Sequence, residues 1–96
     1  MAAYLIADID VRDAERYKEY VEHVPALIRK HRGEYRVRGG ACRVLEGRWQ
    51  PSRLIVLEFP TREDAVAFYD DPEYAPYRNL RLSIADSSLV IVDGCE

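Results

Sequence analysis

The stretch of sequence that decides the fold is Arg53–Phe59, which reads RLIVLEF and is followed by Pro60. Apolar and β-branched residues dominate it, and proline rarely continues a central strand because its nitrogen has no hydrogen to donate. We therefore predict a central β-strand that ends at Phe59. Because side chains alternate between the two faces of a strand, one face carries Ile55, Leu57 and Phe59 and the other carries Val56 and Glu58.

The residues after this strand predict two helical segments and a last strand. Thr61–Asp64 reads TRED and resembles a capping box, with Asp64 at the third helical position. Pro72 ends that helix, because proline interrupts helical hydrogen bonding. Glu73–Ile84 predicts a second helical segment, and Ser88–Val92 (SLVIV) predicts the final strand.

The start of the chain predicts a strand followed by a helix. Ala3–Val11 (AYLIADIDV) alternates between an apolar and a mixed face, which is typical of a half-buried strand. Asp13 is a favourable N-cap, so a helix is predicted from Ala14. Pro25 predicts a kink or a short break in this helix, and Gly33 is expected as the C′ residue after its end.

Between this helix and the central strand, Glu34–Glu46 alternates like a strand but contains Gly39 and Gly40. Glycine within a strand usually marks a bulge or a bend, so we expect one long bent strand or two short ones. The element order is then strand, helix, strand, strand, helix, strand. This order predicts an α+β, ferredoxin-like βαββαβ fold, with a four-stranded antiparallel sheet and its helices on one face.

Length and composition limit the classes of protein to which the chain can belong. Its 96 residues predict a single domain, residues 1–96. The net charge of −3, without a basic run, argues against nucleic acid as a partner, and no apolar stretch is long enough for a membrane span. Neither a phosphate loop nor a metal-ligand motif is present, so we predict no cofactor and no metal. We expect a cytoplasmic protein, because the start of the sequence does not resemble a signal peptide.

One face of the predicted sheet has no helix to cover it. It carries apolar and acidic side chains together, namely Tyr4, Ile6, Asp8, Val56 and Glu58. An exposed apolar patch usually marks an association surface, and a chain of this size gains stability from association. We therefore predict a homodimer in which two sheets face each other and close a barrel with a polar-lined pocket.

Several motifs together resemble the domain-of-unknown-function 1330 family. They are Tyr17-x-x-Tyr20, Arg38-Gly39-Gly40, Glu46-Gly47, the run from Arg53 through Pro60, Tyr69-x-x-Pro72-Glu73-Tyr74, and Arg81. The resemblance covers nearly the whole chain and implies a dimeric α/β barrel of ferredoxin-like protomers, without an established reaction. The sequence departs from the family pattern at Arg32, where a second glycine before Gly33 is common, and at Asp71, where serine is usual.

Glu58 is the candidate catalytic residue. Its carboxylate lies near the end of the central strand, on the face away from Leu57, where it needs a partner or a wet cavity. A desolvated carboxylate has a raised pKa and can act as a general base. The alternative is an ion pair with Arg38 or Arg53 that only fixes the barrel.

The candidate substrate-binding residues begin at the glycine pair. Arg38 has a planar fork suited to a carboxylate, and the missing side chains of Gly39 and Gly40 let a ligand approach the backbone. Arg53 and Arg81 are further candidates for binding the anion. The alternatives are a solvent-facing bulge for Arg38 and a structural ion pair for Arg53.

Tyrosines provide the remaining candidates. Tyr69 and Tyr74 flank the helix break at Pro72, so their hydroxyls are expected at the mouth of the pocket as substrate-binding groups. Tyr17 and Tyr20 lie on the inner stripe of the first helix and are expected in the core with satisfied hydroxyls.

We predict that the protein binds a small carboxylate-bearing or aromatic organic molecule. Arg38 would orient it, and Glu58 would contact it as base or acceptor. Whether the ligand is also converted without a cofactor, and so whether the protein is an enzyme, is left open. The alternative is a non-catalytic dimerisation or ligand-sensing module, in which Glu58 and the arginines form a closed salt-bridge network.

Overall fold

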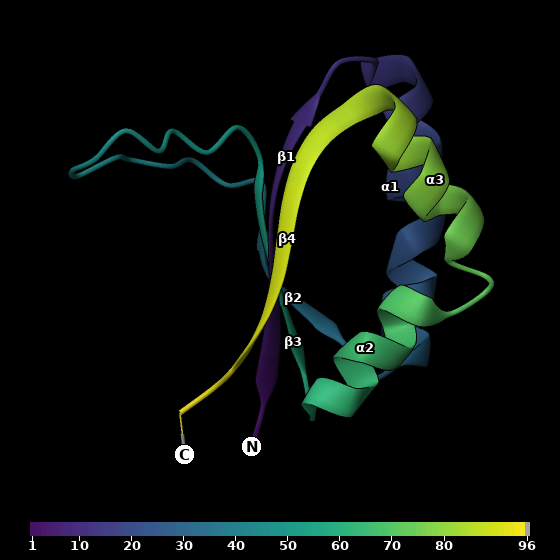
Figure 1. The fold of residues 1–96 in the computed structure, drawn as a ribbon. Helices are drawn as coiled ribbons and strands as arrows, with labels where there is room; N and C mark the ends of the chain where they lie inside the picture. The colour runs from purple at the N-terminus through teal and green to yellow at the C-terminus, as the bar shows by residue number, and fades with distance from the viewer. Residues whose placement is uncertain (96) are drawn as a thin grey trace.

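The computed structural model describes residues 1–95, so Glu96, the last residue of the predicted domain, lies outside the described residues. The elements follow in the order β1 (Ala3–Val11), α1 (Ala14–Lys30), β2 (Glu34–Arg38), β3 (Leu54–Phe59), α2 (Arg62–Asp70), α3 (Ala75–Ile84) and β4 (Ala85–Asp93). The strands pair antiparallel in the order β2-β3-β1-β4, and the helices lie on one face of this sheet (Figure 1). The predicted ferredoxin-like fold is confirmed, with α2 and α3 as two separate helices.

β3 lies inside the sheet, between β2 and β1, as its apolar sequence predicts. The register places Leu57 opposite Leu5 of β1 and Tyr35 of β2. Every second side chain of β3 is buried beneath the helices, whereas Val56 and Glu58 are only partly buried. The hydrophobic core therefore lies between the sheet and the helix layer.

α1 begins as predicted, but its end corrects one prediction. Asp13 Oδ1 accepts a hydrogen bond from a first-turn amide at 3.2 Å, and the helix continues through Pro25 without a break. At its end Arg32, and not Gly33, adopts a left-handed φ of 65°. The amide of Gly33 donates to the carbonyl of Ile28 at 2.8 Å. Arg32 therefore occupies the C′ position, and Gly33, which was predicted there, is the C″ residue.

Gly33 is required by close packing. A Cβ atom at this position would lie 2.5 Å from Cε1 of Phe59 and 2.8 Å from Cγ2 of Ile28. Carbon atoms do not approach so closely without displacement of their surroundings. The connection from α1 to β2 can therefore pass over Phe59 only with glycine here.

The strand predicted from Glu34 is present, but the prediction that it continues to Glu46, as one bent strand or as a second short one, is wrong. β2 ends at Arg38, and residues 39–53, which we call the arm, form no strand. Gly39, with φ of 70°, turns the chain out of the sheet. Figure 1 shows the arm projecting on the side of the sheet away from the helices. The side chains of residues 39–46 alternate as in a strand, but in the described structure these residues have no neighbouring strand with which to pair.

The arm exposes large apolar side chains and is anchored at its base. Leu45 and Trp49 expose 84% and 61% of their surface. The carboxylate of Asp8 in β1 accepts hydrogen bonds from the indole nitrogen of Trp49 and from the amide of Ser52, both at 2.9 Å. The arm therefore presents apolar side chains to solvent while its base stays fixed to the sheet.

We call the sheet face without helices the open face. It carries Tyr4, Ile6, Val37, Val56, Val90 and Val92, which the register brings side by side across the four strands. Val90 is 57% exposed and Val92 is 47% exposed. The apolar character predicted for this face is present, and it extends to the edge strand β4.

The helix layer is tied together by one buried carboxylate. Asp71, in the connection between α2 and α3, accepts a hydrogen bond from Lys30 Nζ at 2.8 Å and lies 2.7 Å from Nε2 of His31. The hydrogen bonds from Lys30 and His31 hold the pKa of Asp71 well below its usual value of 3.8. Asp71 therefore fixes the end of α1 to the α2–α3 connection.

Candidate functional site

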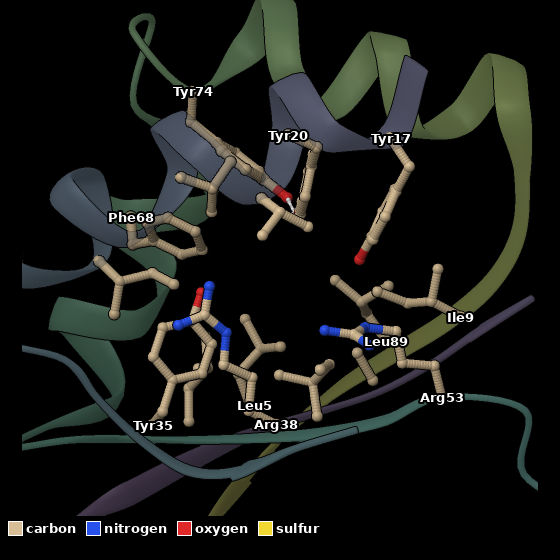
Figure 2. A pocket seen from close by; sticks show the side chains of 16 residues that line it. Leu5, Ile9, Tyr17, Tyr20, Tyr35, Arg38, Arg53, Phe68, Tyr74 and Leu89 are labelled. Carbon is tan, nitrogen blue, oxygen red and sulfur yellow. Dashed lines mark hydrogen bonds between the residues drawn. The ribbon is translucent and has the colours of Figure 1, made fainter. Parts of the chain in front are cut away.

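A small cavity of about 40 Å³ lies between the sheet and the helix layer. Figure 2 shows tyrosine side chains reaching into it from the helices and arginine side chains reaching into it from the sheet. Most of its other lining side chains are aliphatic. The aromatic and charged lining residues are Tyr17, Tyr20, Tyr35, Arg38, Arg53, Phe68 and Tyr74.

The helix side of the cavity presents tyrosine hydroxyls. Tyr17 and Tyr20 are three residues apart in α1 and so share one helix face, and Tyr74 directly precedes α3. The hydroxyls of Tyr20 and Tyr74 are hydrogen-bonded at 2.7 Å (Figure 2). Burial raises the pKa of Tyr20 well above 10 and also raises that of Tyr17, because a phenolate would lose its hydration. Both hydroxyls are therefore protonated at neutral pH.

The sheet side of the cavity presents Arg53 and Arg38. Arg53 is the last residue of the arm, directly before β3, and its carbonyl accepts a hydrogen bond from the amide of Ile9 at 3.0 Å, which fixes its backbone to β1. Its guanidinium lies 5.9 Å from the centre of the Tyr17 ring, and its Nε is buried without a hydrogen-bond partner. The guanidinium of Arg38 stacks 4.4 Å above the Tyr35 ring. In the described residues neither arginine has a carboxylate within 4.0 Å.

Gly39 makes room for Arg53. A Cβ atom at Gly39 would lie 2.7 Å from Nη1 of Arg53, whereas a Cβ atom at Gly40 would have no neighbour within 4 Å. The two glycines of the predicted pair therefore differ. Gly39 packs against Arg53, whereas Gly40 has open space around it.

Arg81, in the last turn of α3, is 1% exposed. Because β4 begins directly after α3, its Nη1 can donate to the hydroxyl of Ser87, while its Nε has no partner. Burial lowers the pKa of Arg81, but Tyr74 and Tyr20 beside it raise the pKa by more, so the guanidinium keeps its charge. In the part of the chain that is described, no ion pair reaches Arg81.

A larger hollow of about 340 Å³ opens to solvent next to the cavity. It is lined by the end of β1, the start of α1 and the base of the arm. Ile9, Tyr17 and Arg53 line both the hollow and the cavity. These three side chains therefore lie between the cavity and this hollow.

The structure does not bring Glu58 to the arginines of the cavity. Glu58 lies on the open face, on the other side of the sheet, where its carboxylate accepts a hydrogen bond from Nε of Arg36 at 3.0 Å. Its side chain is 32% exposed. The predicted pairing with Arg38 or Arg53 is absent, and the role of Glu58 as a base stays a prediction without support from this geometry.

Tyr69 is also outside the cavity. Its ring lies beneath the guanidinium of Arg78 at 5.2 Å, and Arg78 donates to its carbonyl at 3.0 Å. Tyr74 instead is fully buried and reaches the cavity. Of the two tyrosines predicted at the pocket mouth, only Tyr74 contacts the cavity, from inside.

Tyr17, Tyr20 and Tyr35 line the cavity without having been candidates for it. The prediction that Tyr17 and Tyr20 lie on the inner face of the first helix is confirmed. The signal that could have identified Tyr17 and Tyr20 is the density of hydroxyl-bearing rings on one helix face, since a purely structural stripe is more often aliphatic.

Within residues 1–95 no group of three or more His, Cys, Asp or Glu side chains is arranged to hold a metal ion. None of the helices in that range combines the length and the apolar character needed to cross a membrane.

Comparison with protein families gives one match along almost the whole sequence. The model described as "Domain of unknown function (DUF1330)" matches residues 2–95. Among curated proteins no significant match is found.

Solved structures with the same fold are distant in sequence. A protein of unknown function from Rhodopseudomonas palustris is 18% identical, with a TM-score of 0.79 over 99% of this chain and 83% of that one. A dimeric ferredoxin-like protein of unknown function from Jannaschia sp. CCS1 is 11% identical, with a TM-score of 0.72 over 98% and 100% of the two chains. SnoaB, a cofactor-independent oxygenase from Streptomyces nogalater, is 8% identical, with a TM-score of 0.67 over 99% and 94%. At these identities the likeness shows the fold.

Proposed function

Because the chain belongs to the DUF1330 family, whose function is unassigned, we propose its function from the cavity: it binds a small aromatic molecule that carries a carboxylate. The apolar and aromatic lining suits a ring, and the guanidinium of Arg53 suits the anion. SnoaB, which shares the fold, acts without a cofactor, and this is compatible with a site for a small organic molecule alone.

The observation that carries this proposal is the buried, unpartnered Nε of Arg53 at the boundary of the cavity. A buried charged donor without a partner is unfavourable, and proteins usually satisfy such groups. An anionic ligand at this position supplies the missing acceptor. The neighbouring Arg38, also without an acidic partner in the described residues, adds positive charge to the same wall.

The size of the cavity requires an opening movement. A volume of about 40 Å³ holds a few water molecules and no aromatic ring. The adjoining hollow of about 340 Å³ falls within the range of known ligand sites, roughly 300–1,000 Å³. Displacement of the Tyr17 ring from Arg53 would join the two spaces, so the ligand enters from the hollow and directs its carboxylate to Arg53.

The lining supports binding and orientation. It contains tyrosine hydroxyls and guanidinium groups, and no carboxylate or imidazole from the described residues. Glu58 lies across the sheet, so it does not serve as a base for a ligand in this cavity. The proposal therefore assigns hydrogen-bond donors and positive charge to the site, and no side-chain base.

We also propose that the protein is a homodimer that covers its open faces. The support is the continuous set of apolar side chains on that face, with Val90 and Val92 about half exposed. A protein with the same fold from Jannaschia sp. CCS1 is dimeric. The exposed Leu45 and Trp49 project on the same side of the sheet and would contact the second copy.

Calorimetric titration with benzoate and phenylacetate tests the binding proposal, with benzamide as the uncharged counterpart of benzoate. We expect the two acids to bind and benzamide to bind at least tenfold more weakly. Arg53→Gln should weaken benzoate binding by about 10- to 100-fold, as expected for the loss of a charged hydrogen bond worth about 1.5–3 kcal/mol.

Two variants serve as controls. Glu58→Gln, on the open face, and Arg29→Gln, on the exposed side of α1, should leave benzoate affinity unchanged. The binding proposal is wrong if neither acid binds at 10 mM, which is about 5.5 kcal/mol weaker than micromolar binding, or if Arg53→Gln binds benzoate as the original protein does.

A further inference from the structure

The cavity has a second polar region, on the wall opposite the arginines of the sheet. Figure 2 shows the hydroxyls of Tyr20 and Tyr74 reaching into the cavity from the helix layer, while Arg38 and Arg53 reach in from the sheet. Arg81 is close enough to both tyrosines to be influenced by them, and it is not part of the lining. The binding of a carboxylate to Arg53 does not account for any of these three residues.

Arg81 is a buried cation that the described chain does not neutralise. It is 1% exposed, its Nη1 donates to the Ser87 hydroxyl, and its Nε has no partner. The carbonyl end of the α3 dipole favours a cation in the last turn. This effect is weak compared with the cost of burying a charge. A charge kept in such a place points to a negative group that is present only when a ligand is bound.

The two tyrosine hydroxyls can transmit this charge to the cavity. Each hydroxyl has one hydrogen, and their mutual hydrogen bond at 2.7 Å uses one of the two. The other hydrogen has no acceptor among the described residues, and both oxygens lie next to the cavity. The pair therefore offers one free O–H donor, polarised by the guanidinium behind it.

We propose that the Tyr20–Tyr74 pair, backed by Arg81, binds a second oxygen of the ligand, a phenolic or carbonyl oxygen that carries negative charge. This inference rests on the proposed function and narrows its substrate class to hydroxy- or oxo-substituted aromatic acids. The carboxylate lies at Arg53 and the second oxygen at the tyrosines. Arg81 is a positioning residue, because it acts through the two hydroxyls and does not touch the ligand.

The test compares 4-hydroxy-3-nitrobenzoate with 3-nitrobenzoate, which lacks the hydroxyl. We expect the hydroxylated acid to bind at least tenfold more tightly. Its phenol absorbs visible light when ionised, so a spectrophotometric titration of the complex should show ionisation at lower pH than for the free acid. The other charged or titratable side chains that face the cavity are Tyr17, Tyr35, Arg38 and Arg53, and they are unchanged in every variant below.

Arg81→Met should remove the preference for the hydroxylated acid and return its ionisation to the value of the free acid, while 3-nitrobenzoate binds as before. Arg81→Lys, which keeps the charge, should retain part of both effects. A variant with Tyr20→Phe and Tyr74→Phe should behave like Arg81→Met, and it carries the test if Arg81→Met does not fold.

The outcomes separate the two proposals. If 3-nitrobenzoate does not bind the original protein, the proposed function is wrong. If both acids bind equally, or if the ionisation of the bound phenol is unaltered by Arg81→Met and by the tyrosine variant, the inference about the second oxygen is wrong and the proposed function stands.

Discussion

On the open face of the sheet Arg36 pairs with Glu34 and Glu58, whereas on the helix-covered face Arg53 and Arg81 have no acidic partner in the described residues. The remaining ion pairs of arginine, with Asp86, Asp64 and Asp93, are also outside the core. Four exposed arginines are thus paired with acidic residues of the chain, whereas the arginines near the cavity, like the exposed Arg16 and Arg43, have no ion pair in the described residues.

Under the proposed function, the cavity arginines without an acidic partner are the charges that a bound ligand would neutralise. An exposed pair contributes little to stability, about 0–1 kcal/mol, and needs no other explanation. A buried guanidinium without an acidic partner, as at Arg81, costs much more, so its presence requires another benefit. The two faces also differ in their apolar side chains. Those of the covered face are buried, whereas those of the open face are partly or largely exposed.

The largest expected effect tests the close packing of the covered face. Gly33→Ala places a Cβ atom 2.5 Å from the Phe59 ring, which must move together with Ile28. We expect a loss of about 3 kcal/mol in the free energy of unfolding, the upper part of the usual range for overpacking. Urea denaturation measures it. Gly40→Ala, in the open arm, is the matched control and should change stability by less than about 0.5 kcal/mol. Similar values for both variants would contradict the packing argument.

The next prediction tests whether the open face is covered by a second copy. Val90→Asp introduces a charge among the apolar residues of that face, where Val90 lies opposite Ile6. We expect the dimer dissociation constant to rise at least tenfold, about 1.4 kcal/mol, as measured by light scattering across a dilution series. Val66→Asp, on the exposed side of α2, should have no such effect. A monomeric original protein at micromolar concentration would refute the dimer itself.

A smaller effect is expected at Asp71, a buried charge that has partners within the chain, unlike Arg81. The pKa of Asp71 is held below its usual 3.8 by Lys30 and His31, so its stabilising contribution is complete at neutral pH and decreases as pH falls from about the unfolded value of 3.8 through the lower folded pKa. Asp71→Asn should lower the melting temperature at pH 7 and flatten its decline between about pH 5 and pH 3. The exposed neighbour Asp70→Asn should keep the original pH profile. Parallel profiles for all three proteins would show that Asp71 is not a structural partner.

The smallest effect concerns the exit of α1. Arg32 has a left-handed φ of 65°, where glycine is favoured, but it also pairs with Asp64 at 2.7 Å. Arg32→Gly relieves about 1 kcal/mol of backbone strain and loses an exposed ion pair worth about 0.2–1 kcal/mol. We expect a net change within about 0.5 kcal/mol, from the difference of these terms. Arg32→Ala, which loses the pair and keeps the strain, should be less stable than Arg32→Gly in the same urea titration.

Much of the fold could be predicted because its signals are local. The alternation of Ala3–Val11, the Asp13 and Thr61 caps and the apolar run before Pro60 each depend on neighbouring residues only. The arm could not be predicted in this way, because alternation indicates two different faces and does not indicate a partner strand. Whether residues after Arg38 pair depends on the register of β3, which is set by long-range contacts.

The candidate site could be predicted only in part. Arg38, Arg53 and Tyr74 line the cavity, and the sequence indicated each of them by its residue type and its neighbours. Glu58 was assigned correctly to the face away from Leu57, but the cavity lies on the same side as Leu57. Which side of the sheet holds the cavity depends on how the helices fill the space above it, and no pattern within one strand contains that information.

The carboxylate of Asp8 links the arm, on one side of the sheet, to Arg53, which lines the cavity on the other side. It holds Trp49 and Ser52 at the base of the arm, and the next residue is Arg53. In the proposed homodimer, a second copy that orders the arm would restrict Arg53, and the proposed ligand, by ordering Arg53, would restrict the arm. Thermodynamic reciprocity requires both effects to be equal, so aromatic acids should tighten the dimer by the factor by which dimerisation tightens their binding.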